Sequence, residues 1–338
     1  MLAWAAVLAA VTFTVGCAGV GTGAAGGQGP GTSLATGPGS SSPTAAPHTG
    51  GQWSSPHPGK ATSTLARPST GTPAPSSSGV RGALAPTAPA ASGSTPSGAA
   101  GQPADGQRLV TFVNQMAQTI WVAAAPNAAT PLAATGWVLP AGQSVTITPP
   151  NNLNTRFWGR TGCVFNGAGV GHCQTGDCGG LFQCTGWGTI PATLAEVNFH
   201  AWDGLDFYDV SLVDGSNLPM YINIAKSSGG TKDKISPNGC VAAGCTRAVT
   251  CPSALDVKAG GAVVGCISAC AGIGGDQYCC RGQWSARSAC DPAKWPVDYA
   301  AVFKSAEPYA YSYVDDDATS VFTCSGVCDY RITFGISH

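Results

Sequence analysis

The most specific stretch of this chain is residues 169–184, GVGHCQTGDCGGLFQC. Three cysteines, Cys173, Cys178 and Cys184, stand among glycines around a single carboxylate, Asp177. So dense a grouping leaves little room for chance, and the fold expected for the chain depends on it. We expect Asp177 to be mainly structural, held inside a small disulfide-bonded segment.

The other cysteines indicate an oxidising compartment. The chain has fifteen cysteines. Cys17 lies close to the N-terminus, and the remaining fourteen lie between Cys163 and Cys328. An even number of cysteines in one secreted domain predicts a disulfide framework.

Zinc is the competing interpretation of these cysteines. The spacings of Cys240 with Cys245 and of Cys266 with Cys270 resemble those of zinc ligands. No histidine partners stand beside these pairs at zinc-finger spacing, and disulfides account for every cysteine of the domain. We therefore expect no metal ion and no cofactor.

The N-terminus has the character of a secretion signal. From Met1 to about Gly16 the residues are apolar and uncharged, a run too short to span a membrane as a stable helix. We expect residues 1–18 to be a signal peptide and the protein to be secreted. The alternative is a lipoprotein leader, because Thr14-Val-Gly-Cys17 is an imperfect lipoprotein box that would leave Cys17 lipid-anchored at the cell surface.

Composition separates a linker from a folded domain. Residues 19–107 are mainly Gly, Ser, Pro, Thr and Ala, with four charged residues. Such a segment cannot bury enough apolar surface to offset the entropy lost on ordering, so we expect a disordered linker or stalk. Its Ser, Thr and Pro content is also that of O-glycosylated stalks. The folded domain is expected at residues 108–338.

The pattern of the folded part is mainly β. Short runs of β-branched and aromatic residues recur with turn residues between most of them, at 109–113, 119–123, 144–148, 197–199, 207–213, 221–224 and 330–334. This spacing favours a sandwich or flattened barrel over alternating βαβ units. A helix is expected from about Val297 to Ser305, after Pro296.

Charge and motifs exclude several classes of function. The domain has 13 Lys and Arg against 16 Asp and Glu, which argues against a nucleic-acid partner because such a partner needs a basic patch. The sequence contains no nucleophile elbow, no His-Glu-x-x-His and no phosphate loop. Five tryptophans could stack on sugar rings, although we expect at least three of them in the core: Trp121, Trp137, Trp158, Trp187 and Trp202.

The segment around Asp177 resembles the signature of thaumatin-like proteins, the family of osmotin and zeamatin. That signature has roughly the order Gly-x-Gly-x-Cys-x-Thr-Gly-Asp-Cys, followed by Gly-rich residues and another Cys. Further matching segments fall in family order at 111–115, 158–163, 193–196, 205–215, 277–280 and 322–324. The resemblance covers residues 108–338.

The resemblance implies a thaumatin-like flattened β-sandwich or barrel core with two disulfide-rich lobes. The core would comprise residues 108–162, 195–246 and 307–338. Residues 163–194 would form a small disulfide-bonded finger, and residues 247–306 a larger disulfide-rich lobe with the helix.

The resemblance also implies a disulfide pattern, but large thaumatin-like proteins have two more cysteines. Met116 and Gly335 stand where the family has two cysteines that pair with each other, and Glu307 stands at a third family cysteine. Cys328 stands where the family usually has none, so it is the expected substitute partner of Cys245. The implied pairs are Cys163–Cys173, Cys178–Cys184, Cys240–Cys324, Cys245–Cys328, Cys251–Cys266, Cys270–Cys279 and Cys280–Cys290.

Members of the family with antifungal or glucan-binding character have an acidic cleft between the core and the larger lobe. It is built from one arginine, one glutamate and three aspartates. By motif, the corresponding residues are Arg156, Glu196, Asp209, Asp214 and either Asp316 or Asp317. Val314, Asp315 and Ser216 depart from the family's Pro, Lys and Phe, which would alter the cleft wall.

Two interpretations of these carboxylates are open. Crowding raises the pKa of one carboxyl group and a nearby arginine keeps another ionised, so the group could bind a ligand or separate a general acid from a base. Glycoside cleavage needs carboxyl groups about 5 to 5.5 Å apart for retention or about 6.5 to 9.5 Å for inversion. In the structural alternative, Arg156 neutralises buried aspartates, and Asp209 and Asp214 face opposite sides of an unbroken strand.

Two functions follow from these expectations. The first is a secreted, monomeric defence or cell-wall protein that binds β-1,3-glucan or a related neutral polysaccharide without appreciable turnover. The second is a weak endo-β-1,3-glucanase in which Glu196 and Asp209 or Asp214 are catalytic. Inhibition of a foreign hydrolase is a third function, but no motif supports it.

Overall fold

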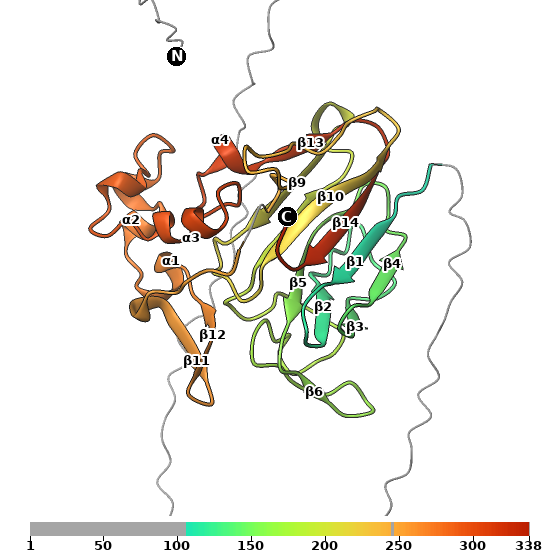
Figure 1. Cartoon of the computed structure of the whole chain (residues 1–338), viewed down its shortest axis with the longest axis horizontal. Coiled ribbons are helices and arrows are strands. Elements are labelled where there is room, and N and C mark those ends of the chain that lie inside the picture. The colour runs from blue at the N-terminus through green and yellow to red at the C-terminus, as the bar shows by residue number, and fades with distance from the viewer. Residues whose placement is uncertain (1–105, 245–246, 338) are drawn as a thin grey trace, which may run out of the picture. The chain divides into compact units, whose positions relative to one another are not determined.

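The computed structural model describes residues 106–244 and 247–337, which are coloured in Figure 1. The signal peptide expected at 1–18, with Cys17, and nearly all of the linker expected at 19–107 lie outside the described residues. Those expectations stay predictions. In the part of the chain that is described, no helix combines the length and the apolar character needed to cross a bilayer.

Two β-sheets form the core of the domain. The first has the strand order β10 (Met220–Ser227), β14 (Cys328–Phe334), β1 (Val110–Asn114) and β4 (Ser144–Ile147). The second has the order β13 (Phe322–Cys324), β9 (Asp206–Ser211), β8 (Leu194–Asn198), β5 (Asn154–Arg160), β2 (Ile120–Ala124) and β3 (Gly136–Leu139). Neighbouring strands are antiparallel except β1 and β14, which are parallel.

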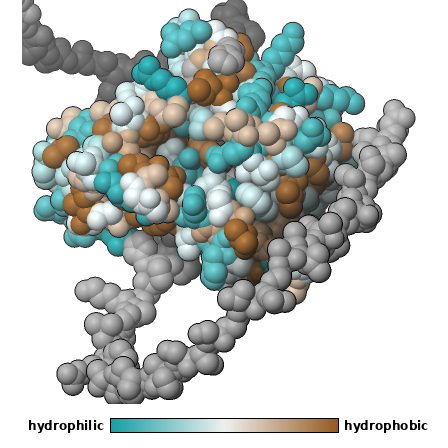
Figure 2. Space-filling view, turned by 60° about the horizontal axis from the view of Figure 1, so that its bottom comes forward, coloured by the Kyte–Doolittle hydropathy of each residue, from teal (hydrophilic) through white to brown (hydrophobic). Residues whose placement is uncertain are grey.

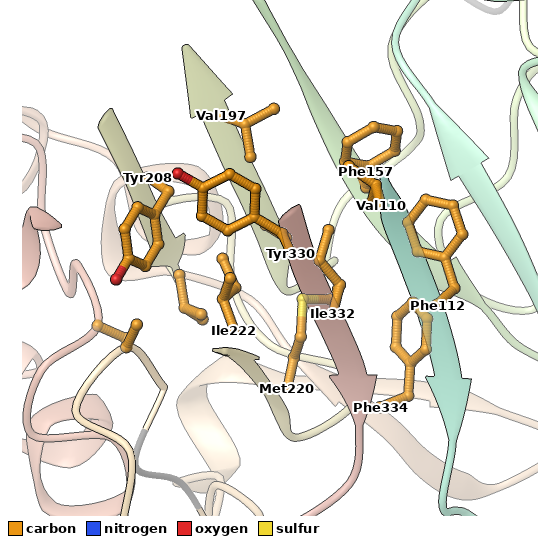
Figure 3. Close-up of a cluster of buried hydrophobic side chains, with 14 of the residues drawn as sticks. Val110, Phe112, Phe157, Val197, Tyr208, Met220, Ile222, Tyr330, Ile332 and Phe334 are labelled. Atoms are coloured by element: carbon orange, nitrogen blue, oxygen red, sulfur yellow. The ribbon is translucent and has the colours of Figure 1, made fainter. Parts of the chain in front are cut away.

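Apolar side chains from both sheets meet in one core (Figure 3). The rings of Phe112 and Phe157 have centroids 5.0 Å apart, and those of Tyr208 and Tyr330 are 5.1 Å apart. Each buried aromatic side chain removes about 150 to 250 Å² from water, so these contacts between the sheets contribute strongly to stability. The predicted mainly β sandwich is confirmed.

The alternation of side chains along the six-stranded sheet leaves its outer face open to polar residues. On β8, Ala195 and Val197 point into the core, while Glu196 and Asn198 occupy the alternate positions and are half-buried. Successive residues of a strand point to opposite faces, so Arg156 on β5 and Asp209 on β9 lie on the same outer face as Glu196, although every residue of β5 after Asn154 is buried. This outer face carries the candidate site.

The finger is a small hairpin with two disulfides. It contains β6 (Val164–Phe165) and β7 (Gly171–His172), and its disulfides are Cys163–Cys173 and Cys178–Cys184. One Asp177 oxygen accepts a hydrogen bond from the backbone N–H of Cys173, and the other accepts one from that of Gly180 and lies 3.1 Å from His172 Nδ1. These contacts agree with a structural role for Asp177.

The larger lobe is built from short elements, drawn in orange beside the sheets in Figure 1. Its strands are β11 (Asp256–Ala259) and β12 (Ala262–Cys266), and its helices are α1 (Ala269–Gly272), α2 (Asp276–Cys279) and α3 (Ala300–Ala306). Single turns of 3₁₀ helix occur at η1 (Trp202–Gly204), which follows β8, and at η2 (Ser253–Leu255), η3 (Gly282–Trp284) and η4 (Pro292–Lys294). The helix expected at Val297 to Ser305 is present as α3 but begins later, where Asp298 accepts a hydrogen bond from the Ala301 N–H. A last short helix, α4 (Asp317–Ser320), precedes β13.

The disulfides depart from the implied pattern near the C-terminus. Five implied pairs are formed: Cys163–Cys173, Cys178–Cys184, Cys251–Cys266, Cys270–Cys279 and Cys280–Cys290. Cys324 is bonded to Cys328, so the implied pairs Cys240–Cys324 and Cys245–Cys328 are wrong. The reason is local: Cys324 ends β13 and Cys328 begins β14, and the short connection brings their Cα atoms within 6.5 Å, a normal disulfide span. Cys240 is disulfide-bonded, and Cys245 lies outside the described residues.

The positions that replace the family's cysteines are filled by packing. Met116 packs against the main core, and Glu307 is fully buried. The backbone N–H of Gln115 donates to the carbonyl of Phe334 at 2.9 Å, which joins the ends of β1 and β14 without a disulfide.

Candidate functional site: an acidic row on the outer sheet face

Three neighbouring strands place Arg156, Glu196 and Asp209 directly opposite one another. Arg156 on β5 pairs with Glu196 on β8, and Glu196 pairs with Asp209 on β9. Opposed residues of antiparallel strands point to the same face, with Cβ atoms about 4.5 to 5.5 Å apart. With Asp214, these residues form what we call the acidic row.

Asp214 joins the row because β9 ends before it. The strand ends at Ser211, and the Gly215 N–H donates to the Leu212 carbonyl at 2.8 Å in a turn. Gly215 has φ +97° and a Cβ there would lie 2.4 Å from the carbonyl oxygen of Cys266, so only glycine fits. The structural alternative placed Asp209 and Asp214 on opposite sides of an unbroken strand, and that premise is wrong.

The same turn ties the row to the larger lobe. Ser216 and Cys266 exchange two backbone hydrogen bonds, each 2.7 Å long. Because Cys266 also bonds to Cys251, the turn that carries Asp214 is fixed against a cross-linked part of the lobe.

Arg156 lies between two carboxylates of the row. Its Nε is 3.3 Å from Glu196 Oε1, and its Nη1 donates to Asp214 Oδ2 at 3.3 Å. The guanidinium carbon lies 3.7 Å from the ring centre of Trp187, a cation–π contact that covers the arginine. Arg156 is therefore only 7% exposed, whereas the side chains of Glu196 and Asp214 are 27% and 28% exposed. Of the three ion-paired side chains, the two carboxylates are therefore more exposed to solvent than the guanidinium group.

The carboxyl groups of the acidic row differ in how far their surroundings raise the pKa. Burial raises the pKa of Asp209 well above its ordinary value; Glu196 raises it further, and Arg156 opposes the shift. Burial also raises the pKa of Glu196, but Arg156 and a hydrogen bond with Ser211 lower it while Asp214 raises it. Asp209 Oδ1 is buried and has no hydrogen-bond partner among the described residues. The pKa of Glu196 lies above its ordinary value but that of Asp209 lies well above it, so Asp209 is the carboxyl group most easily held protonated.

Tyr311 extends the site beyond β9. Its backbone N–H donates to the Val210 carbonyl, and its own carbonyl accepts from Leu212 N–H. The hydroxyl group donates to Asp317 Oδ1 at 2.5 Å. Burial raises the pKa of Tyr311 and the charges of the row raise it further, so the hydroxyl group remains protonated as a donor.

The structure distinguishes Asp316 from Asp317. Asp316 is buried, accepts from the N–H and the hydroxyl group of Ser312, and lies 2.7 Å from Lys304 Nζ. Asp317 instead contacts Tyr311 and forms an ion pair with Arg287 of the larger lobe. Asp317 is therefore linked to the acidic row through Tyr311, while Asp316 fixes its loop against α3 through Lys304.

Three residues of the site did not follow from the sequence: Tyr311, Arg287 and Trp187. Arg287 contacts both Asp315 and Asp317, and the only sign of it was the departure at Asp315, where the family has lysine. Trp187 was one of five tryptophans, and no sequence pattern set it apart. It is 46% exposed, whereas Trp158, from the same set, is buried and donates its Nε1–H to the Gly176 carbonyl.

One group of residues has the proximity that a metal site requires. Within residues 106–244 and 247–337, three side chains have potential ligand atoms within 4.8 Å of one another: Cys280, Cys290 and Asp315. The two cysteines are bonded to each other, so their sulfur atoms are not available as thiolate ligands.

The sequence pattern of the Thaumatin family matches residues 114–336. The chain belongs to the thaumatin family. It is 44% identical over 226 residues to pathogenesis-related protein 5 of Arabidopsis thaliana, which covers 66% of this chain and 88% of that protein. It is 43% identical over 233 residues to pathogenesis-related thaumatin-like protein 3.5 of Cryptomeria japonica, covering 68% and 90% of the two chains.

Solved structures match the chain at lower identity. A thaumatin-like xylanase inhibitor is 24% identical, with a TM-score of 0.34, and the match covers 67% of this chain and 97% of that one. A laminaripentaose-producing β-1,3-glucanase in complex with laminaritetraose is 13% identical, with a TM-score of 0.45, covering 69% and 99%.

Proposed function

We propose that this member of the thaumatin family is a secreted, monomeric protein that binds β-1,3-glucan or a related neutral polysaccharide at the acidic row, in a defence or cell-wall role. The observation that carries the proposal is the arrangement of Glu196 and Asp214, two solvent-reachable carboxylates on either side of one covered arginine. The defence role is supported by the names of the relatives, which are pathogenesis-related proteins.

Neutral sugars suit this arrangement chemically. Their hydroxyl groups donate hydrogen bonds, and hydrogen bonds to ionised acceptors are the stronger kind. The positive charge of Arg156 lies 3.3 Å from an oxygen of each acceptor, and its guanidinium group is itself shielded by Trp187. A polysaccharide carrying carboxylates or sulfates would be repelled by the same acidic groups.

Secretion belongs to the same proposal. The disulfides of the described domain persist in oxidising compartments, which supports an extracellular location. Attachment at the cell surface through a lipid on Cys17 is the alternative. The intact mass of the protein released from its native host cells decides between a cleaved, unlipidated chain and one that begins at a lipid-modified Cys17.

The binding proposal is tested by depletion of the protein from solution with insoluble β-1,3-glucan. The double variant Glu196→Gln/Asp214→Asn removes both exposed charges of the row at nearly constant size. The matched control, Asp203→Asn/Asp276→Asn, removes two charges from exposed positions outside the row. We expect depletion to fall at least several-fold in the first variant and to stay unchanged in the second, because each charged hydrogen bond contributes about 1.5 to 3 kcal/mol. Equal depletion by both would contradict the proposal.

One observation favours a second function, weak endo-β-1,3-glucanase activity. The raised pKa of Asp209 suits a general acid, and the arginine contacts of Glu196 and Asp214 suit an ionised nucleophile or base. A reducing-sugar assay on the same insoluble glucan distinguishes the two functions. Depletion without product supports binding alone, and product that disappears in Asp209→Asn and in Glu196→Gln supports the enzyme.

A further inference from the structure

Trp187 has two faces in different surroundings. One face of its ring covers the guanidinium group of Arg156 at 3.7 Å, and the side chain is nevertheless 46% exposed. The exposed area therefore belongs to the opposite face and the ring edge. An aromatic surface open to solvent lies above the arginine that joins Glu196 to Asp214.

The chain holds Trp187 firmly in this position. Cys184, three residues earlier, is bonded to Cys178. Gly188 lies flat against the ring of Trp158, where an added Cβ would come within 2.7 Å of the ring atoms. The next residue, Thr189, donates its N–H to the Asp177 carbonyl at 2.8 Å. Anchors on both sides preorganise the exposed ring, which reduces the entropy lost when a ligand binds to it.

We propose that Trp187 determines which sugar the acidic row accepts, by stacking its open face on a β-glucopyranose ring. This inference rests on the proposed function, since it concerns the same ligand. A β-glucopyranose ring carries its hydroxyl groups around the rim and C–H bonds on both faces, so it suits a flat apolar surface bordered by hydrogen-bond acceptors. Glu196 and Asp214 are those acceptors, because both contact the arginine that Trp187 covers.

The stacked geometry predicts a preference among neutral sugars. An axial hydroxyl group, as in mannose or galactose, projects from one of the two faces of the ring, and on that face it meets the indole with an unpaired polar group. Burying a polar group without a partner costs free energy. Trp187 therefore selects gluco-configured chains, whereas the carboxylates accept hydroxyl groups of any neutral sugar.

Three variants distinguish stacking of Trp187 on the sugar from a role in which Trp187 only shields Arg156: Trp187→Phe, Trp187→Leu and Trp187→Ala. Calorimetric affinities are measured for laminaripentaose, with mannopentaose as the axial-hydroxyl comparison. We expect Leu and Ala to weaken laminaripentaose binding about three- to tenfold and to reduce the preference over mannopentaose, while Phe stays within about twofold of the wild type. A tryptophan that only shields Arg156 affects both sugars equally, so an unchanged preference in the Leu variant overturns the inference.

Direct contact is read from the indole N–H resonance of Trp187, identified among the nine tryptophans by its loss in Trp187→Phe. We expect it to shift on addition of laminaripentaose, and a resonance that stays in place contradicts stacking.

Failure of the proposed function and failure of the inference about Trp187 give different results. If the wild type does not bind β-1,3-glucan, the proposed function fails. If the wild type binds and Glu196→Gln/Asp214→Asn weakens it while Trp187→Leu does not, only this inference fails.

Discussion

Two of the arginine–carboxylate groups of the domain include an aspartate of β9, and they differ in how fully their polar atoms are paired. At the start of the domain, Arg108 and Asp206 form a fully buried ion pair. Asp206 also accepts from the Tyr330 hydroxyl group and from the His200 N–H, and Arg108 donates to the Asn151 carbonyl. We call this group the closed pair.

The acidic row is open by comparison. Its arginine is covered by Trp187, but its carboxylates reach solvent, and Asp209 Oδ1 has no hydrogen-bond partner among the described residues. A buried polar group without a partner costs stability, and the acidic row keeps such a group where the closed pair has none. The closed pair therefore has the contacts of a structural group, and we propose that the row serves a ligand.

The largest expected effect comes from breaking the closed pair. Asp206→Ala leaves Arg108 buried without its carboxylate, and removal of one partner of a buried pair costs about 3 to 5 kcal/mol. Asp214→Ala, in the open row, should change the unfolding free energy by less than about 1 kcal/mol. Urea denaturation with the disulfides intact measures both. Equal losses would remove the distinction between the two groups.

The next effect concerns the disulfide that borders the closed pair. The Arg108 guanidinium group donates to the carbonyls of Cys328 and Gly326, in the loop that Cys324–Cys328 closes. Replacing both cysteines by serine removes a disulfide that closes a very short loop, so the unfolding free energy should fall by about 2 kcal/mol. Loss of the implied long-range disulfide between Cys240 and Cys324 would lower it by more than about 4 kcal/mol. Denaturation of the double variant and non-reducing peptide mapping decide between them. A peptide joining Cys240 to Cys324 would contradict the observed pair.

A smaller effect is the pH dependence of stability that the row causes. The folded pKa of Asp209 lies above its unfolded value, so between these two values the native state binds more protons than the unfolded state. The stability that protonated Asp209 contributes is therefore lost as the pH rises from about 4 toward the raised pKa. Asp209→Asn removes this loss, so the unfolding free energy of the variant relative to that of the wild type should rise between pH 4 and pH 7. Denaturation curves at both pH values test this, and parallel behaviour of the two proteins would refute it.

The smallest effect is expected at the lobe side of the row. Arg287 is more than half exposed, and its ion pairs with Asp315 and Asp317 are screened by water. Arg287→Ala should therefore lower the unfolding free energy by less than about 1 kcal/mol, and 0.5 M salt should reduce the difference further. A loss above 2 kcal/mol would show that the ion pair is part of the fold, like the closed pair.

The sequence predicted the fold because its signals are local. The cysteine and glycine pattern around Asp177 and the short β-branched and aromatic runs each depend on neighbouring residues, and the mainly β sandwich follows from them. Arg156 and Glu196 were assigned by the family resemblance, and only the structure shows them opposite each other on β5 and β8. Asp214 could not be placed in this way, because its position depends on where β9 ends and on the close approach of Cys266 to Gly215.

Contacts between distant segments were not predictable for a different reason. The cover that Trp187 forms over Arg156 joins residues 31 positions apart, and the contact of Arg287 with Asp317 joins a turn of the larger lobe to the first residue of α4. The Cys324–Cys328 pair was missed because the family's arrangement was carried over to a cysteine that the family lacks. Its short spacing alone would have allowed the local pair.

The central claim is that the open carboxylates of the acidic row bind a neutral glucan. Titration calorimetry with laminaripentaose tests it most directly, on the wild type, on Glu196→Gln/Asp214→Asn and on the control Asp203→Asn/Asp276→Asn. We predict that the row variant binds at least about tenfold more weakly than the wild type and that the control stays within about twofold. Equal affinity of the row variant and the wild type would contradict the account.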